Sequence, residues 1–187
     1  NVSVPLSSRD EINNIENSLV NKKFKTISKL KKTLVSNGVS EVITFSFHSN
    51  RAQEILTGDT SLKISNAISD DQSFMRNSMI FNHLESAELN FKKGIKNIQL
   101  FEIGPIYNSS QSQENILSLL ISSKDDTNSI YKSVNFNFYS LTELASKLIS
   151  SLNFDIKQFN ISRSTSNIYH PGQSAEVHMG KKLIAKY

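Results

Sequence analysis

The sequence predicts an α+β fold in which helices flank an antiparallel sheet. Two strand-like segments, 98–107 and 115–122, are joined by a polar loop, which is typical of a hairpin with a longer connection. A second pair, 175–179 and 183–187, is split by a Gly-Lys turn. Helical stretches lie between these strands, and hairpin strands mixed with packed helices favour the α+β class.

The composition supports a folded domain and excludes several kinds of site. The 187 residues are 37% hydrophobic and 20% charged, enough for one fairly large domain or two small ones. No cysteine is present, which excludes disulfides, thiolate zinc sites and cysteine nucleophiles. Apolar runs such as 116–121 are far shorter than the roughly 20 residues of a membrane span. We therefore expect a soluble cytoplasmic protein with no membrane contact; its charge of +4 permits nucleic-acid binding.

The chain divides into a lead-in and a core. Residues 1–21 predict a lead-in segment and a short helix, because Ser8 and Glu11 have capping-box spacing and apolar residues follow at helical spacing. Residues 22–187 are expected to form one core domain. The chain starts with asparagine and stops at Tyr187 after an apolar run, so we expect a piece of a longer protein, truncated at the C-terminal end of its core.

Residues 22–36 predict a helix, because apolar side chains recur at helical spacing and Gly38 stands where a left-handed C-cap is expected. Its apolar stripe consists of Phe24, Ile27, Leu30, Leu34 and Val35. The remaining surface carries lysine at positions 22, 23, 25, 29, 31 and 32. We expect a solvated face, with phosphate contact as the alternative. Several lysines lie in the first turns, where the helix dipole disfavours positive charge, so a partner would offset that cost.

Strands and short helices are expected next. Residues 41–47 alternate two sets of side chains rich in β-branched and aromatic types, which predicts a strand buried on at least one face. A brief helix at 50–56 is expected to end at Gly58. Another strand is expected at 62–65, ahead of a polar turn.

A longer helix is predicted at 78–93, closed by Gly94 after two lysines. Its predicted apolar face consists of Ile80, Leu84, Ala87 and Phe91.

The clearest helical periodicity starts at Leu141. Ser140 and Glu143 have capping-box spacing, and apolar residues recur at i, i+3, i+4 and i+7 as far as Leu152. A further strand is expected at 159–162. Residues 125–133 are the best candidate for a mobile loop.

Sequence motifs for catalysis are missing. No two of the four histidines lie at i, i+4 on a helix with a carboxylate, so no zincin-type site is predicted. Neither a Gly-x-Ser-x-Gly elbow nor a Gly-rich phosphate loop occurs. His170 and His178 either face a common site or, as we expect, bond to backbone. The acidic pairs at 70–71 and 125–126 are expected to be solvated turn carboxylates rather than metal ligands.

Four ordered blocks of sequence, at 29–47, 65–78, 100–107 and 169–177, carry a specific resemblance. The most informative are Phe-Glu-Ile-Gly at 101–104 and His-Pro-Gly-Gln-Ser-Ala-Glu at 170–176. From about residue 22 to its end, the chain resembles the synthetase-like core of bacterial phenylalanyl-tRNA synthetase beta subunits. The signature residues to which the resemblance assigns a structural role are Glu102, Gly104, Tyr107, His170, Pro171, Gly172 and Glu176.

The resemblance implies a class II aminoacyl-tRNA synthetase-like fold in a non-catalytic copy. In that family the alpha subunit catalyses aminoacylation with ATP and Mg²⁺, the beta core serves assembly of an α2β2 tetramer, and tRNA binds the whole enzyme. No catalytic, cofactor-binding or metal residue is therefore expected in this piece.

Three departures from the family pattern support this expectation. Class II enzymes place an arginine just after the strand that 101–107 resembles, to stabilise charge on the ATP α-phosphate, and here Asn108 stands in its place. Pro105 departs from the arginine usual in this family and removes a backbone donor, which predicts a bulge or an edge. Gln173 replaces another usual arginine, whose ion pair is expected to be absent or rebuilt.

We expect the helices at 22–36 and 78–93 to face the alpha subunit. The predicted interface residues are Phe24, Ile27, Leu30, Leu34, Leu84 and Phe91. Two alternatives remain open: a residual nucleotide or amino-acid site in the sheet, and an RNA-binding module that uses the lysine-rich helix. The RNA alternative is the weaker of the two, since Phe24 is the only aromatic among the lysines.

Overall fold

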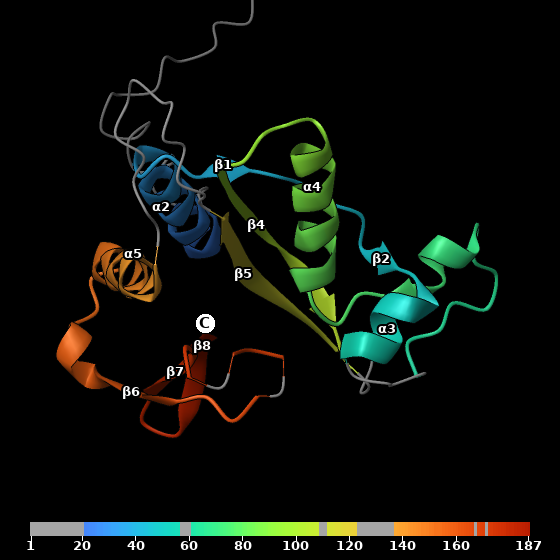
Figure 1. Cartoon of the computed structure of the whole chain (residues 1–187). Coiled ribbons are helices and arrows are strands. Elements are labelled where there is room, and N and C mark those ends of the chain that lie inside the picture. The colour runs from blue at the N-terminus through green and yellow to red at the C-terminus, as the bar shows by residue number, and fades with distance from the viewer. Residues whose placement is uncertain (1–20, 57–60, 109–111, 123–136, 167, 171) are drawn as a thin grey trace, which may run out of the picture.

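The computed structural model describes residues 21–56, 61–108, 112–122, 137–166, 168–170 and 172–187 (Figure 1). Most of the predicted lead-in, the loop expected at 125–133, Gly58 and Pro171 lie outside these residues.

A three-stranded sheet in the order β1-β4-β5 lies at the centre (Figure 1). β4 (Ile98–Tyr107) and β5 (Gln113–Ser122) pair antiparallel along their whole length, which confirms the predicted hairpin. β1 (Ser40–Glu41) runs parallel to β4, although the sequence predicted antiparallel pairing alone. A parallel pair needs a long crossover, and the residues between β1 and β4 provide one that contains a helix.

Helices cover both faces of this sheet (Figure 1). α2 (Lys22–Ser36) and α5 (Phe138–Ser151) lie on one face, and α4 (Ile80–Lys92) lies on the other. The core under α2 and α5 is apolar and consists of Leu34, Val39, Phe101 and Leu144. The core under α4 contains Ala87, Ile98 and Leu100.

α2 begins and ends where the sequence predicted. The Asn21 side chain accepts a hydrogen bond from the Lys23 amide at 2.9 Å and so caps the first turn. Gly38 has a φ of 82°, the left-handed conformation expected after the helix end.

The apolar stripe predicted for α2 is divided between two faces. Ile27 and Leu30 are half-buried and Leu34 is fully buried, whereas Phe24 is 66% exposed and Val35 is 59% exposed. At about 100° per residue, positions eleven residues apart return to nearly the same face, so Phe24 and Val35 lie together, away from Leu34. Leu34 belongs to the core and is not available to a partner, which corrects the predicted interface.

The strand predicted at 41–47 is wrong. Its start pairs with β4, its end is β2 (Phe47–His48), and β2 pairs antiparallel with β3 (Phe74–Met75) in a separate sheet. The residues between cross from one sheet to the other, and their carbonyl groups are bound by the backbone and side chains of distant residues: the Ser46 carbonyl accepts a hydrogen bond from the Arg76 amide at 3.0 Å. The Phe45 carbonyl, for example, accepts hydrogen bonds from the Arg76 and Asn82 side chains.

α5 begins earlier than the sequence predicted. Its capping box is made by Asn137 and Ser140, because the Asn137 side chain accepts a hydrogen bond from the Ser140 amide and the Ser140 hydroxyl from the Asn137 amide. Ser140 is therefore the third helical residue and not the cap. Asparagine is as good a cap as serine, so the alternative start is physically equivalent.

The apolar face predicted for α4 is also wrong in part. Ala87 is buried as expected, but Leu84 is 52% exposed and Phe91 is 46% exposed. The side chains that α4 buries include Asn82 and His83 instead. Hydrogen-bonding groups beneath the helix, described below, account for this polar inner face.

The β2–β3 sheet and the short elements around it form a smaller unit beside the central sheet. α3 (Asn50–Leu56) matches the predicted brief helix, whereas the strand expected at 62–65 amounts to a single bridge between Lys63 and Phe74. The acidic pair at 70–71 lies exposed in a 3-10 turn, as predicted.

The C-terminal strands form their own sheet, in the order β6-β7-β8. The strands are β6 (Phe159–Arg163), β7 (Ala175–Met179) and β8 (Lys182–Lys186). Gly180 has a φ of 61° in the predicted β7–β8 turn.

Candidate functional site

A buried ion pair lies between β4 and the residues after β3. Arg76 Nη1 and Glu102 Oε1 are 2.9 Å apart, and their side chains are 1% and 4% exposed. The Thr44 hydroxyl donates to Glu102 Oε2 at 2.6 Å, and Arg76 Nε donates to the Pro105 carbonyl at 2.8 Å. Such a buried pair is tolerated because most of its polar atoms are hydrogen-bonded. The signature residue Glu102 thus fixes the crossing segment between the two sheets onto β4.

Gly104 provides the space for the guanidinium group. A Cβ at this position would lie 2.7 Å from Arg76 Nη2 and 3.2 Å from Met79 Cε. Real Cβ atoms do not approach other atoms so closely, so a side chain here would displace the ion pair. The glycine of the signature is therefore explained by steric contact.

Pro105 causes neither a bulge nor a register shift, because it pairs with Asn115 inside an unbroken ladder. β1 pairs with β4 only as far as Phe101, so among the described strands β4 has no neighbour on that side at Pro105, which agrees with the predicted edge. The Pro105 carbonyl points to Arg76 instead of β5. Proline lacks the backbone N–H, which at this position would point away from β5 as the carbonyl does. No hydrogen bond to β5 is therefore lost.

Two histidines lie near this cluster. His83 Nε2 is 3.7 Å from Glu102 Oε2, and its Nδ1 is 3.3 Å from the Ser118 hydroxyl. Burial lowers the pKa of His83 from its ordinary 6.5, since the effect of burial outweighs that of the nearby carboxylate. Burial likewise lowers the pKa of His48, whose Nε2 is 2.6 Å from Gln53 Oε1.

At the described ends of the β4–β5 connection, Tyr107, Asn108 and Ser112 carry no positive charge. Asn108, where the resemblance expects a cation, uses its side chain to accept a hydrogen bond from the Ser112 amide at 3.1 Å. The backbone amide of Tyr107 donates to the Arg76 carbonyl at 2.9 Å, and Arg76 itself is 1% exposed. The nearby arginine is thus neutralised by Glu102 and inaccessible to a phosphate.

The second signature block lies in the other sheet. The His170 ring accepts a hydrogen bond from the Gly172 amide at 3.0 Å, as predicted, whereas His178 Nε2 lies 3.7 Å from Glu176 Oε2. Glu176, on β7, pairs with Lys186 at 3.5 Å and accepts a hydrogen bond from Ser164 at 3.2 Å. Gln173 is exposed. This block and the Glu102 block belong to separate sheets, and each stabilises its own.

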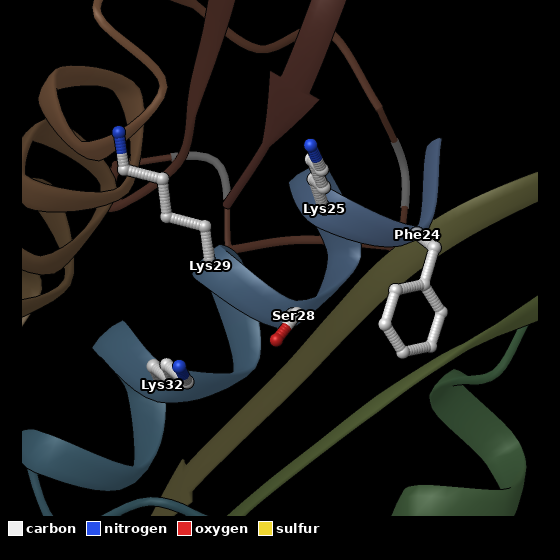
Figure 2. A pocket seen from close by; sticks show the side chains of 5 residues that line it. All are labelled: Phe24, Lys25, Ser28, Lys29 and Lys32. Carbon is white, nitrogen blue, oxygen red and sulfur yellow. The ribbon is translucent and has the colours of Figure 1, made fainter. Parts of the chain in front are cut away.

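Within the described residues, one face of α2 is exposed. A shallow hollow of about 270 Å³ is lined by Phe24, Lys25, Ser28, Lys29 and Lys32 (Figure 2). α2 packs against α5 and β1 on its other sides. Among the predicted interface residues, Phe24, Leu84 and Phe91 are exposed, Ile27 and Leu30 are half-buried, and Leu34 is buried.

Sequence reasoning missed the partners of Glu102. The available signal was the Glu102 carboxylate next to the apolar residues Leu100, Phe101 and Ile103, since a buried charge needs a counter-charge. The sequence alone does not identify Arg76 as that counter-charge. No cluster of three metal-binding side chains occurs among the described residues, and no described helix is long and apolar enough to cross a membrane.

Comparisons with known proteins identify the family. The family model described as phenylalanyl tRNA synthetase beta chain CLM domain matches residues 13–186. The phenylalanine–tRNA ligase beta subunit of Fusobacterium nucleatum is 26% identical over 182 residues, which cover 92% of this chain and 23% of that protein. The beta subunit of Pseudoalteromonas translucida is 31% identical over 84% of this chain and 21% of its own length. The chain thus spans less than a quarter of these two relatives.

A solved structure shares the fold. Pyrrolysyl-tRNA synthetase from Desulfitobacterium hafniense superposes with a TM-score of 0.65 at 17% identity, covering 88% of this chain and 57% of that one. This likeness confirms the predicted class II synthetase-like α+β fold.

Proposed function

This chain belongs to the family of phenylalanyl-tRNA synthetase beta chains, and on that premise we propose that it is a non-catalytic domain that packs against the alpha subunit. In the whole cytoplasmic α2β2 enzyme it would support charging of tRNA with phenylalanine. ATP and Mg²⁺ would be used by the alpha subunit, and tRNA would contact the assembled enzyme.

The β4–β5 turn is the observation that supports a non-catalytic role. Amino-acid activation needs a cation aimed at the α-phosphate, where charge develops in the transition state. Asn108 is uncharged and bound to Ser112, and the Arg76 guanidinium is buried against Glu102. The residues present therefore do not fit ATP, and we assign them no catalytic step.

The outer face of α2 supports a role in packing. Phe24 and Val35 are large apolar side chains that are more than half exposed on one face of the helix. Two large exposed apolar side chains on one helix face are a feature that a packing partner would cover. Leu84 and Phe91 give α4 a second, separate exposed face.

Reconstitution of the full beta subunit with the alpha subunit tests the packing role. The double variant Phe24→Ala, Val35→Ala should fold but associate more weakly with alpha, measured by analytical ultracentrifugation. Ile161→Ala, at a residue 51% exposed on β6, is the matched control and should associate normally. If alpha binds the folded double variant at full strength, α2 is not the contact.

Calorimetric titration of the chain with ATP and with phenylalanine tests the non-catalytic role. No saturable heat is expected with either ligand. Saturable binding would instead support the residual nucleotide or amino-acid site.

A further inference from the structure

We propose that Asn37, at the C-terminal end of α2, is a site of spontaneous deamidation that the native fold protects. The modification converts the side-chain amide to a carboxylate and loosens α2 from the core that it shares with α5. This chemistry belongs to the chain itself and does not depend on the function proposed above.

The sequence at the end of α2 is chemically labile. Asn37 is followed by Gly38, and this is the only Asn-Gly pair among the 187 residues. Asparagine is a thermolabile residue, because the next backbone nitrogen can attack its side-chain carbonyl carbon. Glycine leaves that nitrogen unhindered, since it has no Cβ and few conformational limits. In an unfolded chain, Asn37 should therefore be modified before the other asparagines.

The reaction needs water and no other reactant. The Gly38 nitrogen loses its proton and forms a bond to Asn37 Cγ, while Nδ2 takes up a proton and leaves as ammonia. Water then opens the resulting cyclic imide at either of its two carbonyl carbons. The product is aspartate or isoaspartate, in which the main chain runs through the former side chain. No group is oxidised or reduced.

The fold keeps the two reacting groups apart. The Gly38 amide donates a hydrogen bond to the Val35 carbonyl at 3.0 Å, so its hydrogen is already engaged. The Asn37 side chain is held at both ends: Nδ2 donates to the Thr33 carbonyl at 2.7 Å, and Oδ1 accepts from Lys147 Nζ on α5 at 3.4 Å. Ring closure must turn the Gly38 nitrogen toward Asn37 Cγ. This movement rotates ψ of Asn37 away from its value of 13° and breaks the bond to Val35.

The end of α2 is anchored in the apolar core. The amides of Asn37 and Val39 both donate to the Leu34 carbonyl, at 3.0 Å and 3.1 Å. Leu34 and Val39 are 0% and 2% exposed and belong to the cluster under α2 and α5. Deamidation thus requires local opening of the end of α2, and its rate should follow the population of that open state.

The product would weaken the contacts that protect the amide. A carboxylate cannot donate to the Thr33 carbonyl, and its charge lies at the C-terminal end of a helix, where the dipole disfavours anions. Isoaspartate also adds a main-chain atom before Gly38, so the hydrogen bonds of Gly38 and Val39 to the last turn cannot all persist. The Lys147 ammonium would offset part of this loss. Each modified chain should therefore open more readily at this end of α2.

Peptide mapping by mass spectrometry tests the proposal on the full beta subunit, incubated in mildly alkaline buffer with and without urea. In urea, Asn37 should deamidate much faster than Asn66, which is exposed and precedes Ala67. In native buffer the rate at Asn37 should be at least about tenfold lower than in urea. Leu34→Ala, which leaves a cavity beneath the end of α2, should raise the native rate. Val35→Ala, at an exposed position on the same helix, should leave it unchanged.

The variant Asn37→Asp reports the consequence of modification. Its urea midpoint should be lower than that of the native subunit, whereas the control Asn66→Asp should unfold at the native midpoint. Equal rates at Asn37 and Asn66 in urea would overturn the labile site. Equal rates at Asn37 with and without urea would overturn the protection by the fold, and an unchanged midpoint for Asn37→Asp would overturn its effect on α2.

Discussion

Both faces of the central sheet have an apolar cluster, but only the face under α4 also has a buried ion pair, although the two faces share one strand. Phe101 and Glu102 are neighbours on β4 and are 0% and 3% exposed. Phe101 faces α2 and α5 and contacts apolar side chains such as Leu34. Glu102 faces α4 and binds Arg76, Thr44 and, less closely, His83.

This difference shows what each face tolerates. An apolar core accepts changes that conserve volume, because its contacts are non-directional. A buried ion pair depends on both partners, because one charge left alone is strongly destabilising. The four predictions below test this contrast, from the largest expected effect to the smallest.

Removal of one member of the ion pair should have the largest effect. Arg76→Met leaves the Glu102 carboxylate buried without its cation and should destabilise the chain by about 3–5 kcal/mol. The double variant Arg76→Met, Glu102→Leu should recover most of this loss, since no charge stays buried. Urea unfolding measures both. A single variant that loses less than about 1 kcal/mol would show that the pair is not essential to the α4 face.

Truncation on the apolar face should have a smaller effect that depends on volume. Leu34→Ala should cost about 3 kcal/mol, because it leaves a cavity in the core. Leu34→Met, which conserves volume, should cost less than about 1.5 kcal/mol. Val35→Ala, on the exposed face of the same helix, is the matched control and should change stability by about 0.5 kcal/mol or less. Equal costs for Leu34→Ala and Val35→Ala would contradict the placement of α2.

The placement of α2 could be predicted from the sequence to a large extent, whereas the Arg76–Glu102 ion pair could not. The bounds of α2, the β4–β5 hairpin and the Gly180 turn follow from local patterns, so they were predicted correctly. The strand expected at 41–47 had a valid local pattern, but Arg76 and Asn82 bind its backbone from distant positions. Such contacts leave no periodic signal.

The candidate site also depends on a contact between distant positions, which the sequence does not reveal. Glu102, Gly104 and Tyr107 were named from the signature, yet their common partner Arg76 was not. For α2, helical periodicity predicted that the apolar side chains form one stripe along the helix. It did not separate Phe24 from Leu34, because the positions of α5 and the sheet decide which side is covered.

Introduction of a methyl group at Gly104 should have an intermediate effect on the polar face. Gly104→Ala should cost about 1–3 kcal/mol, because the new Cβ overlaps the Arg76 guanidinium. In the Arg76→Met, Glu102→Leu background the cost should fall, and a double-mutant cycle measures this coupling. Additive costs in the cycle would contradict the steric explanation.

Acidification should produce the smallest effect, through His83 on the α4 face and His48 on β2. His83 and His48 have pKa values lowered by burial, so below about pH 6.5 the unfolded chain binds more protons than the folded one. Stability is therefore complete above pH 6.5 and should fall by up to about 1.4 kcal/mol per histidine at pH 5.5. His83→Gln should remove its share of this slope, as urea midpoints at pH 7.5 and 5.5 would show. An unchanged slope would contradict the lowered pKa of His83.

The strand order of the central sheet has a consequence for handling the chain in solution. Within the described residues, β5 has a strand neighbour on one side only, along ten residues that include four leucine and isoleucine side chains in its last six positions. A strand edge without a neighbouring strand is the template on which foreign strands add and aggregates grow. Isolated from its larger protein, the chain should therefore be colloidally unstable at high concentration even while each of its sheets remains folded.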